Sequence, residues 1–474
     1  MSADNAAEEE SVGALSEGAS FDGAPAEQLS TNRRVFNLAW PVIGENFLQT
    51  MLGIVDTFLV ARLGAASIAG VGTSLQVMFF VIAALSALSV GSSVLVAQAV
   101  GAHKFQRASD LARQSIVWSV CFSVPLALLG FFLADPILSV FGLEADVAAI
   151  ASEYLKVTMG TVVVLVVLFI GGGVLRGAGD SRTPMQVTAL ANVINIFLTY
   201  GLIFGAWGLP ELGAVGSAWA TFLSRLLAVV LLLWAMSRGR SGITLNWQAD
   251  WFPRIPVARS VLQIGIPAAL EQVLISAAFT VLTIVVASLG TAALAAHRIA
   301  FNALSLSFLP GIGFSIAATA LVGQSVGARR LDQGREAAHT AARWGVIWMG
   351  SMALLFFILA TPIMQAFTDE TEVIRQGAAS LRVLAFSQPF WALFFVYSGS
   401  LRGLGNTNFP LRTNAVGIWS TVLLGWLAVA FWNGGVTEVW AAFILTSPVM
   451  AFILFRRFRQ EIRNALAPQP VAGD

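Results

Sequence analysis

Carboxylates inside apolar segments are the residues of this chain whose chemistry most needs an explanation. Glu45, Gln49 and Asp56 lie in one apolar segment at intervals of 4 and 7 residues, so a helix would carry all three on one face. Glu271 lies in a second apolar segment. Because a charged group is costly to bury in a membrane-spanning helix, such carboxylates are candidates for binding a proton or a small cation.

A second polar stripe has the composition that a partner for Asp56 would need. Asn192, Asn195 and Thr199 are spaced by 3 and 4 residues, again on one helical face. A carboxylate that faces amides and a hydroxyl could hold a proton or a small cation, and a Na+ at Asp56 is the one metal that we expect. The alternative is that Asp56 only hydrogen-bonds neighbouring helices. The predicted cation-coupling site consists of Asp56, Asn195, Thr199, Gln49 and Glu45.

Aromatic residues are concentrated in one late segment, residues 373–401. Aromatic faces can bind flat organic cations through cation–π contacts, although a stripe of this kind can also be core or lipid contact. The predicted substrate cavity combines these rings with the polar residues near Glu271. It consists of Glu271, Gln272, Ser276, Trp391, Phe395 and Tyr397.

The composition defines the class of protein that holds these groups. Of 474 residues, 57% are hydrophobic and 11% are charged, and the mean hydropathy is +0.78. These values exclude an ordinary cytosolic enzyme, a nucleic-acid binder and a disordered scaffold, and they favour an all-α polytopic membrane protein. The three histidines lie far apart, so we expect no zinc or haem site. A Walker A sequence is absent, which argues against ATP as the energy source.

Twelve apolar segments, most of them longer than the ~20 residues needed to cross a bilayer, follow an acidic N-terminal stretch. Residues 1–32 contain seven acids and no Lys or Arg, which predicts a disordered cytoplasmic tail. The segments are expected near 35–61, 66–99, 112–134, 147–175, 184–206, 212–237, 258–288, 292–325, 338–360, 373–401, 411–431 and 435–456. Most of the 27 Lys and Arg fall on one side of these spans. That side is expected to be cytoplasmic, with both termini inside.

An internal repeat relates the two halves at a constant offset of 226 residues. Glu45 corresponds to Glu271, and Gln98 corresponds to Gln324 in matching Gln-x-Val-Gly-Ala loops. Six spans in each half predict two lobes that enter the membrane in the same direction, as in many secondary transporters; a duplicated scaffold without transport is the alternative. The expected division is 33–240 for the N-lobe (TM1–TM6), 241–257 for a cytoplasmic linker, 258–460 for the C-lobe (TM7–TM12) and 461–474 for a C-terminal tail.

The repeat fails where the polar stripes lie. At the offset of 226, Asp56 corresponds to Leu282 and Gln49 to Ile275. We therefore expect the N-lobe to carry ion coupling.

The chain resembles the multidrug and toxic compound extrusion (MATE) family over about residues 33–460. The most specific matches are GIVDT at 53–57, the two Gln-x-Val-Gly-Ala loops, AHRI at 296–299, and the segments LRGAGD and LRGLGN. The resemblance implies two six-helix lobes in a V shape, alternating access, and export of organic cations driven by inward H+ or Na+.

The resemblance also assigns individual residues. Asp56 matches the family's first-helix aspartate and Asn195 its fifth-helix asparagine, whereas Thr199 stands where the DinF-like branch often has a second aspartate. Ile275 and Trp391 stand where the NorM-like branch has two acids, so the C-lobe sodium site of that branch is expected to be absent. We place the chain nearer the DinF-like or general bacterial branch than the NorM-like branch.

These observations predict a secondary active multidrug exporter of the cytoplasmic (inner) membrane, not an enzyme. It would exchange H+ or Na+ for small cationic amphipathic molecules, as a monomer in the lipid bilayer, without a cofactor and without a nucleic-acid partner. One alternative is a lipid-linked precursor flippase of related architecture, which would need a strongly cationic cavity. Another is a membrane enzyme acting on lipids, which would need clustered histidines or paired acids at the membrane surface.

Overall fold

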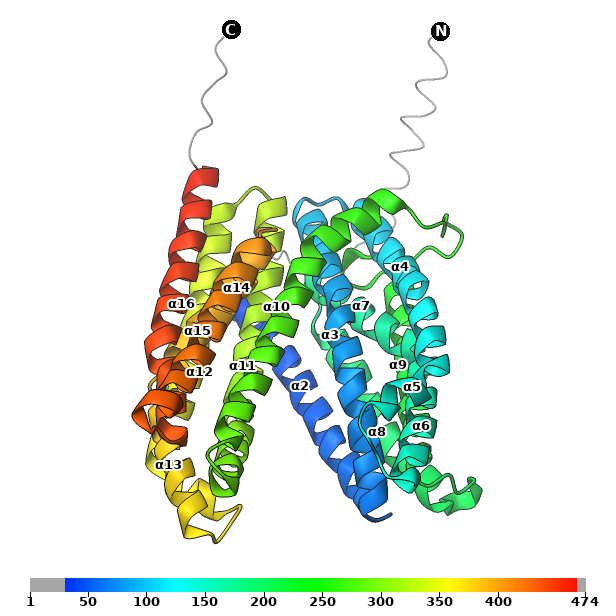
Figure 1. Ribbon diagram of the computed structural model, residues 1–474. Coiled ribbons are helices and arrows are strands. Elements are labelled where there is room, and N and C mark those ends of the chain that lie inside the picture. Colours follow the sequence, from blue (N-terminus) through cyan, green and yellow to red (C-terminus); the bar gives the residue numbers. More distant parts are fainter. Residues whose placement is uncertain (1–29, 467–474) are drawn as a thin grey trace, which may run out of the picture.

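The computed structural model describes residues 30–466, apart from the side chains of Ala84, Ala87 and Arg240 (Figure 1). Residues 1–29 of the expected acidic tail and 467–474 of the expected C-terminal tail lie outside the described residues. Thr31 and Asn32 already belong to the first helix, and the last helix continues to Leu466. Hydropathy marks where a helix leaves the hydrocarbon, but the helix itself extends into water beyond that point.

The described chain is helical, and its helices fall into two successive sets. The first set comprises α2 (Thr31–Ala61), α3 (Ala65–Gly101), α4 (Phe105–Phe132), α5 (Ala134–Ser139), α6 (Ala145–Gly160), α7 (Val162–Gly177), α8 (Arg182–Phe204) and α9 (Ala214–Ser237). The second comprises α10 (Ile255–Ala287), α11 (Thr291–Gly327), α12 (Leu331–Gln365), α13 (Thr371–Ala385), α14 (Gln388–Gly403), α15 (Asn408–Trp432) and α16 (Val436–Leu466). Short 3-10 turns follow α8 and α9 at Ala206–Gly208 and Arg240–Gly242.

These helices account for the twelve predicted spans. Within the described residues, nine helices are long and apolar enough to cross a membrane alone, and two bent pairs raise the number to eleven. The pairs α6–α7 and α13–α14 bend by 49° and 54°, at positions that the 226-residue repeat superimposes. The twelfth span is α2, whose 31 residues are long enough to cross, while Glu45 and Asp56 lower its apolar character. The structure confirms the all-α polytopic fold with two six-helix lobes.

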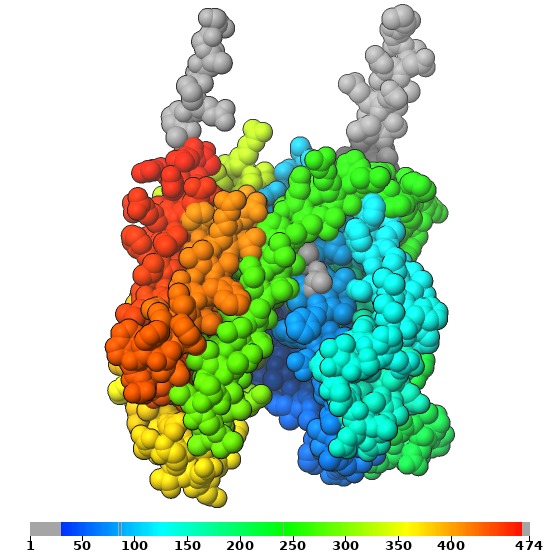
Figure 2. All heavy atoms as spheres, in the orientation of Figure 1, coloured from blue at the N-terminus to red at the C-terminus, as the bar shows by residue number. Residues whose placement is uncertain are grey.

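Each lobe has its own apolar core, but α2 and α10 cross between the lobes. Val35 and Leu38, near the start of α2, pack in the core of the C-lobe. In the corresponding place, Val261 near the start of α10 packs in the core of the N-lobe. Farther along, α2 packs against α8 and α10 against α15. The lobes are therefore joined at one end by an exchange of helices, and they diverge toward the other end (Figures 1 and 2).

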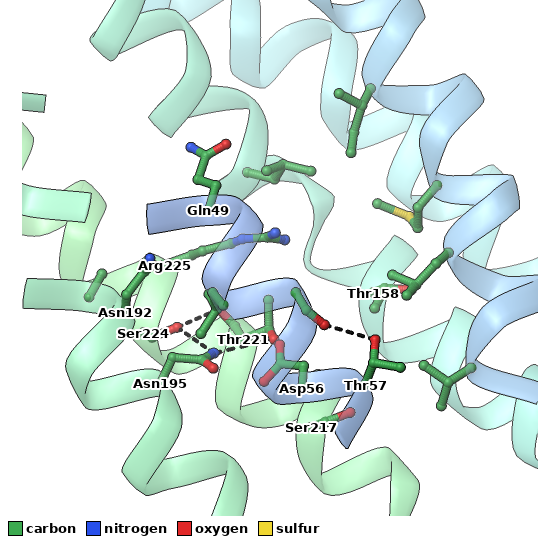
Figure 3. A pocket seen from close by; sticks show the side chains of 18 of the residues that line it. Gln49, Asp56, Thr57, Thr158, Asn192, Asn195, Ser217, Thr221, Ser224 and Arg225 are labelled. Carbon is green, nitrogen blue, oxygen red and sulfur yellow. Dashed lines mark hydrogen bonds between the residues drawn. The ribbon is translucent and has the colours of Figure 1, made fainter. Parts of the chain in front are cut away.

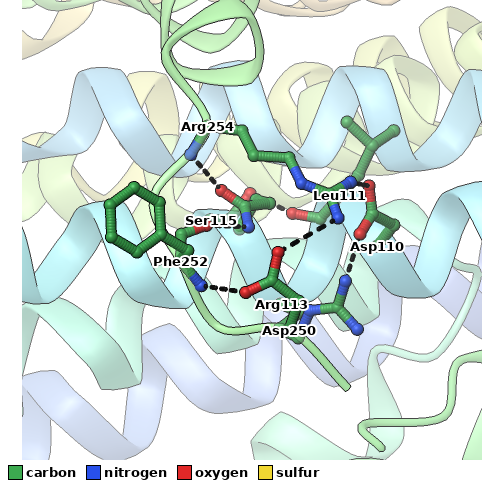
Figure 4. Close-up of polar contacts among 8 residues, drawn as sticks. Asp110, Leu111, Arg113, Ser115, Asp250, Phe252 and Arg254 are labelled. Carbon is green, nitrogen blue, oxygen red and sulfur yellow. Dashed lines mark hydrogen bonds and ion pairs between the residues drawn. The ribbon is translucent and has the colours of Figure 1, made fainter.

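The segment that connects the lobes is held to the N-lobe by hydrogen bonds and ion pairs. Gln114 of α4 is fully buried; its amide donates to the carbonyl of Phe252 at 2.8 Å and accepts from the backbone N–H of Arg254 at 2.8 Å. The Arg254 side chain pairs with Asp110 at 3.1 Å, and Asp110 also pairs with Arg113 (Figure 4). These contacts place the start of α10 against the N-lobe before the helix crosses to the C-lobe.

Two repeat-related hydrogen bonds join the lobes at the ends of α3 and α11. Gln98 donates to the carbonyl of Gly403 at 3.3 Å, and Gln324 donates to the carbonyl of Gly177 at 3.0 Å. A Cβ atom at Gly101 would overlap the Gln324 carbonyl, so the glycine lets the two backbones approach. We call the hydrogen bonds of Gln98 and Gln324 the interlobe latch. The helices that form it end after an even number of membrane crossings; they are α3, α7, α11 and α14. The latch therefore lies on the same side of the membrane as the two ends of the described chain.

Replacing Gln98 and Gln324 together by leucine should weaken the interlobe latch. Each lost hydrogen bond is worth about 0.5–1.5 kcal/mol, so we expect the lobes to separate more often at this end. With the exposed Cys121 replaced by serine, spin labels at Gln106→Cys and Asp332→Cys, exposed positions at the starts of α4 and α12, would report the separation by double electron–electron resonance. The expected result is a shift toward longer distances.

The matched control is Gln76→Leu, which changes an exposed glutamine on the same helix α3 and should leave the distances unchanged. Identical distance distributions for the wild type and the double variant would show that the latch does not hold the lobes together.

Candidate functional site

A cavity of about 400 Å3 lies within the N-lobe, on the face of α2 that carries Asp56. Among the described residues that line it, Asp56 is the one acid and Arg225 the one base. Its other polar lining residues come from α2, α6, α8 and α9, and its apolar wall comes chiefly from α3 and α7. The polar lining residues are Gln49, Thr57, Tyr154, Thr158, Thr188, Asn192, Asn195, Ser217, Thr221 and Ser224. The cavity therefore offers an apolar wall opposite a polar one.

Asp56 and Asn195 face each other from α2 and α8 (Figure 3). The two helices are held in register by Asn192, which donates to the carbonyl of Leu48 at 2.8 Å. Asn195 and Thr199 are both fully buried. The predicted meeting of the two polar stripes is therefore observed, with Gln49 on the same wall and Thr199 within hydrogen-bond reach of both Asn195 and Asp56.

The amide of Asn195 has two possible orientations, and only the second satisfies both its oxygen and its nitrogen beside a deprotonated Asp56. In one, its nitrogen donates to Ser224 at 3.1 Å and to Thr221 at 3.3 Å, and its oxygen accepts from Thr199 at 3.1 Å. With oxygen and nitrogen exchanged, the nitrogen donates to Asp56 Oδ1 at 3.3 Å and to Thr199 at 3.1 Å, and the oxygen accepts from Ser224 at 3.1 Å. One orientation presents an acceptor to Asp56 and the other a donor.

Arg225 and Tyr154 are the ionisable cavity residues that the sequence interpretation missed. Both interact electrostatically with Asp56, and Figure 3 shows Arg225 reaching from α9 toward the α2 face that carries Gln49 and Asp56. A signal was available, because Arg225 is a basic residue in the middle of an apolar span, where charge marks function by default. The sequence could not show that this face of α9 meets Asp56.

Glu45 and Glu271 occupy equivalent buried ion pairs, one in each lobe. Glu45 pairs with Arg176 at 3.0 Å and borders a smaller cavity of about 130 Å3 that also reaches Gln49. Glu271 pairs with Arg402 at 2.6 Å and accepts from Asn414 at 2.5 Å. The arginines of the two LRG segments therefore bind carboxylates of α2 and α10, so these acids join three helices within each lobe.

The residues predicted to form a C-lobe substrate cavity do not line the N-lobe cavity. Trp391 and Tyr397 are buried. The Trp391 ring packs against five phenylalanines, Phe395 among them, and the Tyr397 hydroxyl lies 3.0 Å from His339 Nδ1. Gln272 is exposed on the surface of α10, with Ser276 half-buried one turn later. In this structure Trp391, Phe394 and Tyr397 pack in the core of the C-lobe, the alternative that the sequence left open, whereas Phe386 and Phe390 of the same segment are exposed.

A family model described as MatE matches residues 41–201 and again residues 267–427, two stretches related by the same 226-residue offset. The chain belongs to the MatE (MATE) family. Members of this family are transporters, not enzymes, which agrees with the prediction made from the composition.

Relatives match nearly the whole chain. The "Probable multidrug resistance protein NorM" of Thermotoga maritima is 31% identical over 440 residues, 91% of this chain and 92% of that protein. The "Uncharacterized transporter YisQ" of Bacillus subtilis is 25% identical over 90% of this chain and 94% of its own length. The name of the first relative does not confirm the predicted placement nearer the DinF-like branch.

Solved structures share the fold. A MOP superfamily transporter from Pyrococcus furiosus, whose description reports a binding pocket of reversed polarity, superimposes with a TM-score of 0.86 at 22% identity, covering 95% of this chain and 100% of that one. A MATE P26A mutant gives a TM-score of 0.87 at 22% identity, with coverage of 94% and 99%. At this identity the likeness establishes the architecture of this chain, including its two lobes.

Replacing Glu271 by leucine should destabilise the protein, because Arg402 would be left with a charge that its carboxylate no longer balances. Breaking one partner of a buried pair costs about 3–5 kcal/mol, whereas replacing both with apolar groups is often close to neutral. We therefore expect Glu271→Leu to lower the melting temperature markedly and Glu271→Leu/Arg402→Leu to recover most of the loss. The measurement is thermal unfolding of the purified variants in detergent.

The control pair is Glu372 and Arg375, which form an exposed ion pair at 2.5 Å on α13. Replacing Glu372 by leucine should have little effect, since exposed ion pairs contribute little. A melting temperature for Glu271→Leu equal to that of the wild type would contradict a structural role for the buried pair.

Proposed function

We propose that the protein exports small amphipathic molecules from the cell in exchange for protons, and that Asp56 is the group that takes up the proton. The observation that carries the proposal is the position of Asp56 as the one acid that lines the described N-lobe cavity, opposite Asn195. The names of the relatives support multidrug efflux as the general activity. The family places that activity in a membrane transporter rather than an enzyme.

The two orientations of Asn195 match the two protonation states of Asp56. A deprotonated carboxylate only accepts hydrogen bonds, so it pairs with the amide nitrogen. A protonated carboxyl also donates, so it pairs with the amide oxygen, and the Thr199 hydroxyl then donates to that oxygen as well. In both states the far side of the amide is satisfied by Ser224. Asn195 would therefore stabilise either state, which suits a group that must gain and lose a proton in every cycle.

A proton suits this site better than Na+, the other coupling ion left open by the sequence. Sodium needs several oxygen ligands converging on one point, as hard cations generally do. Around Asp56, Asn195 and Thr199 can supply oxygens, but Arg225 adds a positive charge to the same cavity. That charge opposes the binding of Na+ and of a proton alike, so the difference between the two ions is the number of ligands that each needs. Proton uptake instead needs one carboxylate oxygen.

Sidedness follows from the basic loops. Most Lys and Arg lie on the side of the interlobe latch, so we assign that side to the cytoplasm with both termini inside. The structure then corresponds to the outward-open state, because the lobes diverge on the opposite side (Figure 2). A proton that enters from outside would neutralise Asp56 and remove the counter-charge of a bound cationic group. The release of substrate is thereby coupled to proton binding.

For the supporting residues, the oligomeric state and the membrane, we propose what the sequence predicted. Thr199, Gln49 and Glu45 support Asp56 from the same wall or the adjoining cavity, the working unit is a monomer, and the membrane is the inner membrane. Placement nearer the DinF-like branch rests on Ile275 and Trp391, which are apolar where the NorM-like branch has acids. A flippase for lipid-linked precursors is disfavoured, because the cavity has one base among its described lining residues.

Gradient-driven flux in liposomes tests the proposal. Purified protein, with a fluorescent organic cation on one side, is subjected separately to a proton gradient and to a sodium gradient. We expect flux under the proton gradient, and we expect Asp56→Asn to abolish it because the amide cannot take up the proton. The sodium gradient should be ineffective at equal pH.

The control is Glu372→Gln, which neutralises an exposed carboxylate of α13 outside the cavity and should leave the flux unchanged. Full proton-driven flux in Asp56→Asn would remove Asp56 from the mechanism. Flux driven by sodium alone would replace the proton with Na+.

A further inference from the structure

Arg225 lines the N-lobe cavity and has no contact ion pair among the described residues. Arg176 and Arg402 each have a carboxylate within 3.0 Å. Arg225 attracts Asp56 electrostatically, yet among the described residues it makes no hydrogen bond and has no carboxylate oxygen at ion-pair distance. Its position in the repeat corresponds to Ala451, so the second half offers no equivalent. The guanidinium therefore lies in the N-lobe cavity with its donors available.

A guanidinium without hydrogen-bond partners inside a membrane protein favours a ligand with an anionic group. A charged group in this setting is costly unless a partner compensates it. The planar fork of five N–H donors matches a carboxylate through two parallel hydrogen bonds. Apart from Asp56, which attracts Arg225 without pairing with it, the described lining of the cavity is neutral or apolar, so a hydrogen-bonding partner for the guanidinium would come with the ligand.

The arrangement of the walls defines the rest of the ligand. Asp56 can bind a cationic group when it is deprotonated, and Arg225 can bind an anionic group in the same cavity. The opposite wall is apolar and offers contact to a hydrophobic ring system; it includes Leu75, Met78, Ile82, Leu165 and Phe169. A molecule with all three features leaves the filled cavity electrically neutral, whereas a simple cation leaves the charge of Arg225 unbalanced.

We propose that Arg225 is a specificity-determining residue that selects substrates with a carboxylate, so that the preferred substrates are zwitterionic amphiphiles rather than simple organic cations. The inference rests on the export function proposed above and deepens it. Arg225 binds the carboxylate of the substrate, Asp56 binds its cationic group, and protonation of Asp56 then breaks one of these two contacts.

Two dyes that differ only in a carboxylate test whether Arg225 recognises that group. A rhodamine with a free carboxylate and its methyl ester share one ring system, but the acid is a zwitterion and the ester is a cation. Proton-driven flux of each dye is measured with liposomes containing wild type, Arg225→Met or Arg225→Lys. A charge-assisted hydrogen-bond pair of this kind is worth roughly 10- to 100-fold in selectivity. We expect the wild type to favour the acid by about that factor and Arg225→Met to lose the preference while it still transports the ester.

Arg225→Lys keeps the charge without the planar fork, so its preference for the acid should be intermediate. Binding of both dyes to the purified variants, measured by fluorescence polarisation without a gradient, should show the same order. Melting temperatures identify any variant that fails to fold, and Arg225→Gln then replaces Arg225→Met.

Three outcomes are distinguishable. If Arg225→Met lowers transport and binding of both dyes by the same factor, Arg225 acts only through Asp56 and the inference is wrong. If the wild type transports both dyes equally and Arg225→Met does the same, Arg225 does not select the carboxylate. If the wild type transports neither dye under any gradient but binds the acid through Arg225, the export function fails while the recognition of the carboxylate stands.

Discussion

The cost of a charge inside a membrane protein is the constraint on which this structure depends. Such a charge must be paired, neutralised by a proton or compensated by a ligand. Glu45 and Glu271 meet this requirement through Arg176 and Arg402, and each pair ties helices together within its lobe. Asp56 lies in a cavity instead. In the proposed mechanism, this carboxylate, which is held in a cavity rather than in a contact ion pair, is the group that takes up the proton.

The duplication explains how one scaffold holds both charges in contact ion pairs and a carboxylate in a cavity. The two halves keep the ion pairs, the helix bends and the interlobe hydrogen bonds, which all lie at matching positions. They differ where the second half has Leu282 in place of Asp56. The C-lobe fills the corresponding region with packed aromatic rings around Trp391. In the proposed mechanism, the N-lobe carries the site and the C-lobe is the partner against which it moves.

Much of this arrangement could be predicted from the sequence, because its signals are periodic. Apolar runs located the twelve spans, a constant offset located the repeat, and helical spacing placed Asp56 and Asn195 on faces that the structure brings together. What the sequence left open depends on rotation and packing between distant helices. The spacing of aromatic residues does not say which side of a helix faces a cavity, and the structure packs Trp391, one of the predicted substrate-cavity residues, in the core of the C-lobe. Arg225 was passed over because only tertiary packing brings α9 beside Asp56.

The most direct test is to observe the proton on Asp56 itself. Infrared difference spectra of the protein in lipid, recorded as the pH is lowered in sodium-free buffer, report the conversion of carboxylates to carboxylic acids. We expect a carboxylic C=O band that is absent in Asp56→Asn and retained in Glu271→Gln. The absence of any band that depends on Asp56, or a carboxylate signal of Asp56 that responds to sodium at constant pH, would contradict proton uptake by Asp56.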